Sequence, residues 1–215
     1  MFQVTQVGSW PRSRELLRAL RACQKGEISR DAFQRRADEE VRHCIDIQLK
    51  AGVDIVVDGE LRRDNFYSFV TDKLDGTRLM SLAEMLDVVE DKSGFEEILQ
   101  TLDVPASAIR NPTCTGRLSQ REPFALNDYL FVRELTDKPV KVTLPGPYLL
   151  TRAMWVGDFS QAAYEDKVAM GRDIVRLLRD ETIALRDAGC DFVQFDEPVL
   201  TEVVFSRDND RRTFM

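Results

Sequence analysis

The stretch Gln48–Glu60, which reads QLKAGVDIVVDGE, joins the end of a helix to a strand and then to a polar turn. Gly52 ends the helical pattern, since glycine readily adopts the backbone conformation that follows a helix. Asp54–Val57 is short, apolar and rich in β-branched residues, as is typical of a buried strand. Asp58–Glu60 follows at once. The stretch therefore predicts a helix-to-strand step, with acidic residues at the C-terminal end of the strand.

The same step recurs along the chain. We expect strands at Gln3–Val7, Asp54–Val57, Thr113–Leu118, Val140–Leu144 and Asp191–Phe195. We expect helices at Ser13–Lys25, from the N-cap Ser29 to Ala51, at Ala125–Leu135, and from the N-cap Ser160 to Ala188. Helices of this length between short apolar strands predict parallel β/α units.

Two of the expected helices show one apolar face each. Residues three and four positions apart share a face of a helix, and that face is the one expected to be buried. The helix that follows Ser29 has the face Phe33, Ala37, Val41, Cys44, Gln48 and Ala51. The helix that follows Ser160 has the face Val168, Val175, Leu178 and Leu185.

Parallel β/α units close either as a doubly wound sheet or as a barrel. No G-x-G-x-x-G follows the first expected strand, which weakens the dinucleotide-binding alternative. A complete barrel has eight strands in about 250 residues, and about five strands are found in this chain. We therefore predict an α/β fold, the TIM (β/α)8 barrel, of which this chain covers about the first five β/α units.

The domain organisation follows from this count. Residues 1–215 are expected to form the N-terminal portion of a single catalytic barrel, truncated before its end. Residues 61–112 fit no β/α unit and are expected to be an insertion, with short helices near 81–89 and 95–102. The sequence leaves the oligomeric state open.

Composition excludes several classes of protein. Hydrophobic residues make up 43% and charged residues 31%, which is ordinary for a globular enzyme. The net charge of −7, with dispersed basic residues, argues against binding to nucleic acid or an anionic membrane. No apolar run is long enough to span a membrane, and the N-terminus does not resemble a secretory signal, so we expect a cytoplasmic protein.

Polar residues follow three of the expected strands, where a barrel places its functional groups. Val7-Gly8-Ser9 offers backbone amides and a hydroxyl that can bind a carboxylate, and its glycine permits close approach of a ligand. Glu60 suits an ammonium group. Asp196 and Glu197 directly follow an apolar strand, where acids are costly unless they have partners or a task.

These segments resemble the catalytic barrel of the cobalamin-independent methionine synthase family. The matching motifs are Val7-Gly8-Ser9-Trp10-Pro11-Arg12, the stretch Gln48–Glu60, Thr136-Asp137-Lys138-Pro139-Val140-Lys141 with Gly146-Pro147, and Gln194-Phe195-Asp196-Glu197-Pro198. They occur in order and at compatible spacing over nearly the whole chain.

The resemblance implies a methyltransferase that transfers a methyl group to the thiol of homocysteine to form methionine. It implies that Val7, Gly8 and Ser9 hold the carboxylate of homocysteine, and that Glu60 and Asp196 bind its ammonium group. It also implies a zinc ion on the homocysteine thiol. The family's zinc ligands follow the D-E-P motif, and we expect them beyond residue 215, because His43 is the single histidine and the four cysteines are widely spaced. No metal ligand and no catalytic residue is identified within the chain.

The methyl-donor side departs from the family pattern. An Arg-Cys pair of the family falls on Ser107 and Ala108, ahead of Arg110. The family's folate-contacting tryptophan falls on Arg152, with Trp155 three residues later, whereas Glu202 matches an acid that contacts folate. Donor contacts are therefore expected from Glu202, Trp155 and Arg110. The donor itself is expected to be 5-methyltetrahydrofolate or a methylcorrinoid.

Two alternatives stay open at this point. A related zinc barrel could alkylate another thiol, as an epoxyalkane:thiol transferase does. The chain could instead be a non-catalytic truncated remnant. An amino-acid pocket with two acids favours homocysteine over the first alternative.

Overall fold

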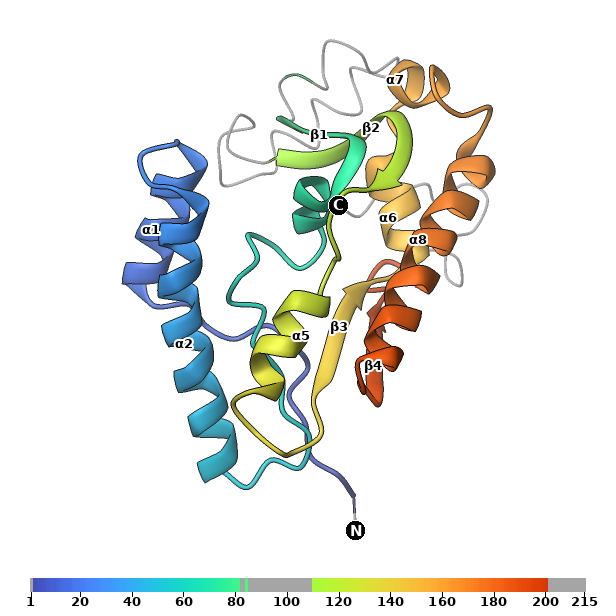
Figure 1. Cartoon of the computed structure of the whole chain (residues 1–215). Coiled ribbons are helices and arrows are strands. Elements are labelled where there is room, and N and C mark those ends of the chain that lie inside the picture. Colours follow the sequence, from blue (N-terminus) through green and yellow to red (C-terminus); the bar gives the residue numbers. More distant parts are fainter. Residues whose placement is uncertain (1, 82–83, 85–109, 201–215) are drawn as a thin grey trace. The chain divides into compact units, whose positions relative to one another are not determined.

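The computed structural model describes residues 2–81, 84 and 110–200, and the elements are labelled in Figure 1. The chain divides into two compact units. The first contains Met1–Phe69, Pro123–Leu144 and Asp180–Phe195, and the second contains Val70–Glu122, Pro145–Arg179 and Asp196–Met215. The helix expected at 95–102 lies outside the described residues, as does most of the one expected near 81–89.

The first unit begins with two helices, α1 (Arg14–Gln24) and α2 (Arg30–Lys50), which pack against each other. Ser13 caps α1 by accepting a hydrogen bond from the Leu16 amide at 3.0 Å. Ser29 caps α2 in the same way, through the Ala32 amide at 3.2 Å. The predicted N-cap Ser29 is confirmed, and Ser13, expected as the first residue of its helix, is the N-cap of α1.

The buried face of α2 agrees with the prediction in five of its six members. The buried members are Phe33, Ala37, Val41, Cys44 and Gln48. Ala51 is exposed, because it is the C-cap residue and lies just past the last helical turn. Gln48 is satisfied inside the unit: its side-chain amide donates to the Val57 carbonyl at 2.8 Å and accepts from the Val57 amide at 3.0 Å.

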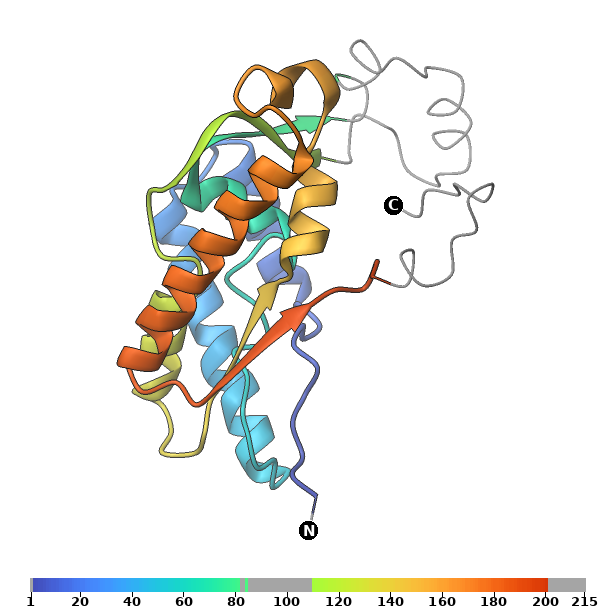
Figure 2. The same ribbon diagram turned by 90° about the vertical axis from the view of Figure 1, so that its right-hand side faces the viewer.

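Parallel pairing links four of the five predicted strands. Thr5 bridges Ile55 and Val56 bridges Val140, both in parallel. The strand β3 (Lys141–Pro145) pairs with β4 (Phe192–Asp196), and the two arrows point the same way in Figure 2. Consecutive parallel neighbours are the arrangement of β/α units. The described residues thus form an α/β fold, and they contain no closed barrel.

The predicted strand at 113–118 does not belong to this parallel set. It is part of β2 (Arg110–Gln120), which pairs antiparallel with β1 (Leu74–Ser81) in the second unit. The prediction of a β/α unit here was wrong. A short apolar run shows that a strand forms but does not show the direction of its partner. The hairpin instead extends the segment expected to be an insertion.

The long helix predicted to follow Ser160 begins later than expected, at Lys167. Three helices lie within the described residues Pro147–Asp187, where one was predicted: α6 (Pro147–Met154), the short α7 (Gly157–Gln161) and α8 (Lys167–Asp187), whose last residues belong to the first unit. Ser160 lies inside α7 and is buried. Its hydroxyl accepts from the Val156 amide at 3.0 Å and donates to the Cys114 carbonyl at 3.1 Å. Ser160 therefore satisfies buried backbone groups and does not cap α8.

The predicted buried face of α8 is half right. Leu178 and Leu185 are buried, whereas Val168 and Val175 are 60% and 52% exposed. The second pair follows the first by ten residues, which turns the two pairs about 80° apart around the helix. Only one of them can point into the core, and the buried residues Met170, Ile174, Leu177 and Glu181 complete its face.

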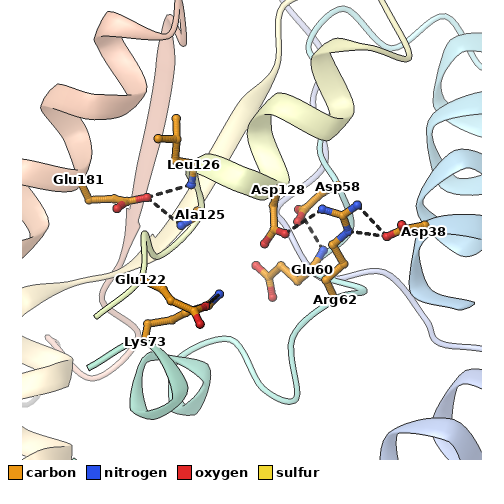
Figure 3. Close-up of polar contacts among 10 residues, drawn as sticks. All are labelled: Asp38, Asp58, Glu60, Arg62, Lys73, Glu122, Ala125, Leu126, Asp128 and Glu181. Carbon is orange, nitrogen blue, oxygen red and sulfur yellow. Dashed lines mark hydrogen bonds and ion pairs between the residues drawn. The ribbon is translucent and has the colours of Figure 1, made fainter. Parts of the chain in front are cut away.

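Glu181 explains how α5 (Leu126–Arg133) begins. Its carboxylate accepts hydrogen bonds from the amides of Ala125 and Leu126 at 2.7 and 2.9 Å (Figure 3), and from the Phe124 amide at 2.9 Å. The first amides of a helix lack partners within the helix, and an acid is favoured at that end.

None of the described helices combines the length and the apolar composition needed to cross a membrane.

Candidate functional site

The turn after Val57 holds Glu60 in an unusual backbone conformation. Its φ of 56° makes it the single non-glycine residue with positive φ among those described, a conformation that costs of order 1–3 kcal/mol and concentrates at functional sites. Asp58 Oδ1 accepts from the Glu60 amide at 3.0 Å. Arg12 Nη2 donates to the carbonyls of Glu60 and Arg63 at 2.9 and 2.8 Å. The backbone of Glu60 is therefore fixed from both sides.

The Glu60 side chain is buried, with 2% of its surface exposed. Its Oε1 atom accepts a hydrogen bond from the Thr143 hydroxyl at 2.8 Å. It also lies against Gly8, where an added Cβ would come within 2.5 Å of Oε1. A side chain at position 8 would therefore force the Glu60 carboxylate to move. The structure brings Gly8, Glu60 and Thr143 together from three segments of the first unit.

Arg63 contacts this cluster through Thr143, and sequence reasoning did not single it out as a site residue. It is 3% exposed, and its Nη1 donates to the Thr143 carbonyl at 2.9 Å and to the Thr143 hydroxyl at 3.3 Å. Its guanidinium carbon lies 4.5 Å from the centre of the Phe69 ring, a distance typical of a cation–π contact.

The segment Val7-Gly8-Ser9 is held in place by hydrogen bonds to the Val7 carbonyl oxygen. Lys141 Nζ and Gln194 Nε2 both donate to this oxygen at 3.0 Å, and Lys141 also donates to Gln194 Oε1 at 2.7 Å. Lys141 is 2% exposed, so its charge is almost fully removed from water. The side chains of Val7 and Ser9 are exposed. The backbone of Val7-Gly8-Ser9, rather than the Val7 side chain, is the part that this arrangement fixes.

We expect Lys141→Met to lower the free energy of unfolding by about 2–3 kcal/mol, because it removes the charge-assisted hydrogen bonds that the buried Lys141 ammonium donates to the Val7 carbonyl and to the Gln194 side chain. Urea denaturation monitored by circular dichroism measures this loss. The matched control is Lys50→Met on the exposed surface of α2, expected to change stability by less than about 0.5 kcal/mol. Equal effects of the two substitutions would contradict a positioning role for Lys141.

A buried ion network lies beside the acidic turn. Arg62 contacts Asp38 at 2.6 Å and Asp128 at 3.1 Å (Figure 3). It also lies over the Phe131 ring, 3.9 Å from its centre. Burial raises the pKa of Asp128, the charge of Asp58 raises it further, and the neighbouring arginines lower it. The network ties α2, the acidic turn and α5 together within the first unit.

The two acids of the Asp196-Glu197-Pro198 motif differ in environment. The Glu197 carboxylate accepts from the amides of Tyr148 and Leu149 at 2.7 and 2.8 Å, so it caps the start of α6 within the second unit. Gly146 precedes this helix, and an added Cβ would lie 2.2 Å from Glu197 Cδ. Asp196 is half-buried, and its carbonyl accepts from the Gly146 amide at 2.8 Å. Glu197 is therefore a structural residue, which leaves Asp196 as the candidate ligand of the pair.

The predicted donor-side residues are not brought together among the described residues. Trp155 is half-buried at the C-terminal end of α6. Arg110 begins β2, but its side chain is outside the described set. Glu202 also lies outside the described residues.

A metal site is not formed within residues 2–81, 84 and 110–200, where no group of three or more histidine, cysteine or acidic side chains has suitable positions. Burial raises the pKa of the Cys44 thiol to about 12 and also raises the pKa values of Cys114 and Cys190. A raised pKa disfavours the thiolate that a metal requires. His43 is exposed on α2.

Comparison with known proteins places this arrangement in a family. Residues 2–215 match the family model described as the catalytic domain of cobalamin-independent synthase, and the chain belongs to this family. It is similar to 5-methyltetrahydropteroyltriglutamate–homocysteine methyltransferases. Identity is 26% for the enzyme of Halalkalibacterium halodurans and 28% for that of Chelativorans sp., each over 100% of this chain. The chain covers 26% and 25% of those two proteins, so it spans about a quarter of their length.

Solved structures agree on the fold. A Listeria monocytogenes protein, a methionine synthase candidate of the vitamin-B12 independent type, matches 99% of this chain with a TM-score of 0.67 and 21% identity. The B12-independent methionine synthase of Shewanella sp. W3-18-1 matches 82% with a TM-score of 0.60 and 24% identity. This chain covers 58% and 47% of those two chains, respectively.

Proposed function

We propose that this protein is a methyltransferase that transfers a methyl group to the thiol of homocysteine and forms methionine. Family membership and the names of the similar enzymes support this reaction. These relatives are named for homocysteine, which favours that acceptor over another thiol. The observation that carries the proposal is the buried Glu60 carboxylate, held by Thr143 against Gly8 in the first unit.

In this proposal the site binds both charged ends of an amino acid. The backbone amides of Val7-Gly8-Ser9 and the Ser9 hydroxyl bind the carboxylate. The nearby buried ammonium of Lys141 adds a favourable charge for that anion. Glu60 binds the ammonium group, and Asp196 joins it on the strength of the family resemblance.

The proposed methyl donor is 5-methyltetrahydrofolate in its pteroyltriglutamate form, after the names of the relatives. The comparisons do not support the corrinoid donor. The sulfur of homocysteine attacks the methyl carbon, a carbon–sulfur bond forms, and the carbon–nitrogen bond of the donor breaks. The thiol loses its proton, and the donor nitrogen takes up one proton in its place. Donor contacts from Glu202, Trp155 and Arg110 are part of this proposal.

The described residues do not fit the zinc ion expected for the family, as the absence of a suitable donor group among them shows. We therefore derive no step through zinc, and the role proposed for this chain is to bind and orient the amino-acid end of homocysteine. We also propose that residues 1–215 form the N-terminal portion of a TIM (β/α)8 barrel, in which residues 61–112 are an insertion. The proposed location of the protein is the cytoplasm.

Calorimetric titration of the intact protein tests the proposal. Homocysteine is compared with 4-mercaptobutanoate, which lacks the amino group, and 3-mercaptopropylamine, which lacks the carboxylate. We expect each analogue to bind at least about 10-fold more weakly, since each leaves a charged group of the site unpaired. Methionine formation from methyltetrahydrofolate is measured in parallel. Equal binding of all three thiols, or no methionine, contradicts the proposal.

A further inference from the structure

The direction of the hydrogen bond between Thr143 and Glu60 follows from Arg63. A guanidinium only donates hydrogen bonds, so its contact with the Thr143 hydroxyl uses a lone pair of that oxygen. The hydroxyl proton is then available for Glu60 Oε1, 2.8 Å away. The three side chains form a chain of donors that runs from Arg63 through Thr143 to Glu60.

This direction matches an ionised carboxylate, which accepts hydrogen bonds and donates none. A threonine hydroxyl turned the other way would match a protonated, neutral Glu60. Arg63 is itself fixed by its second bond, from Nη1 to the Thr143 carbonyl at 2.9 Å, and by the Phe69 ring. The orientation of the hydroxyl is therefore set by groups that are buried and held in place.

The space around the carboxylate is equally restricted. A Cβ at position 8 would lie 2.5 Å from Glu60 Oε1 and 3.1 Å from Thr143 Cγ2, so Gly8 lies close to both side chains. Thr143 is 1% exposed and sits in β3, where all five residues are buried. A hydroxyl at such a position is costly unless it has a specific partner.

We propose that Thr143, oriented by Arg63, is a positioning residue that sets the selectivity of Glu60 for the ammonium group of the substrate. This inference rests on the proposed function, because it takes Glu60 as the ligand of that group. The Thr143 hydroxyl holds Glu60 Oε1 in place, and this also fixes the position of the second carboxylate oxygen. Its effect is on the preference for an amino acid over an analogue that lacks the ammonium group.

Thr143→Val tests this, since valine keeps the shape of threonine and removes the hydroxyl. We expect homocysteine to bind the intact variant about 10- to 100-fold more weakly, and 4-mercaptobutanoate to change by less than about 3-fold. Thr143→Ser keeps the hydroxyl and is expected to restore the wild-type preference to within about 3-fold. Thr71→Val is the matched control: its buried hydroxyl has no hydrogen-bond partner among the described residues, and we expect wild-type binding.

The outcomes separate this inference from the proposed function. A wild-type protein that does not prefer homocysteine over 4-mercaptobutanoate overturns both. A wild-type preference that Thr143→Val retains in full overturns the positioning role alone. The positioning role is also overturned if Thr143→Val loses affinity equally for both thiols, or if the serine variant binds like the valine variant. A merely structural residue would act in that way. Thermal unfolding of each variant identifies one that fails to fold, in which case the serine variant decides.

Discussion

Glu60→Gln is expected to weaken homocysteine binding about 100-fold. The amide has nearly the shape of the carboxylate and still accepts the hydrogen bond from Thr143, so the cluster is preserved. The change removes the negative charge that faces the ammonium group at a site only 2% exposed to water. Hydrogen bonds to charged groups contribute about 1.5–3 kcal/mol, which corresponds to roughly 10- to 150-fold in affinity. Calorimetric titration measures the loss.

The control for Glu60→Gln is Glu134→Gln, which neutralises an exposed acid at the C-terminal end of α5. We expect this variant to bind homocysteine as the wild type does. Affinity for 4-mercaptobutanoate should change little in Glu60→Gln, because that thiol has no ammonium group. If Glu60→Gln binds homocysteine within threefold of the wild type, Glu60 is not the ammonium ligand.

Gly146→Ala is expected to lower the free energy of unfolding by about 3 kcal/mol. The backbone at Gly146, with φ −74° and ψ 159°, suits any residue, so the effect is steric. The new Cβ would lie 2.2 Å from Cδ and Oε1 of Glu197 and would displace this carboxylate from the amides of Tyr148 and Leu149. The start of α6 then loses two charge-assisted hydrogen bonds, each worth about 1.5–3 kcal/mol.

Urea denaturation measures this effect, with Gly171→Ala as the control. Gly171 lies within α8, the nearest atom to its added Cβ is Thr151 Oγ1 at 3.2 Å, and alanine favours the helix, so we expect unchanged or slightly higher stability. In a double-mutant cycle, Glu197→Ala should cost less in the Gly146→Ala background than in the wild type. Additive losses would show that Gly146 and Glu197 act independently.

Features encoded locally could be predicted from the sequence. The serine caps of α1 and α2 depend on residues three positions apart, and both are present. The strands β3 and β4 were expected from short apolar runs, and they form at those places. The positions of Gly8 and Glu60 just after two of the strands were also expected from the sequence, whereas their contact with each other was found only in the structure.

Features that depend on distant partners could not be predicted. The antiparallel partner of β2 and the capping of α6 by Glu197 join segments far apart in the chain. The same holds for Thr143, which lies 83 positions from Glu60. One signal was available: Lys141 and Thr143 are polar residues inside an otherwise apolar strand, and buried polar groups need partners.

The left-handed backbone conformation of Glu60 lowers the stability of the fold, whereas its carboxylate serves the proposed binding of substrate. Glycine or asparagine would adopt a φ of 56° with less strain than glutamate. Variants selected only for resistance to unfolding would therefore tend to lose the glutamate, whereas selection for substrate use would keep it. A glutamate that persists there in related chains would be a record of selection for ligand binding, at a site where folding alone favours another residue.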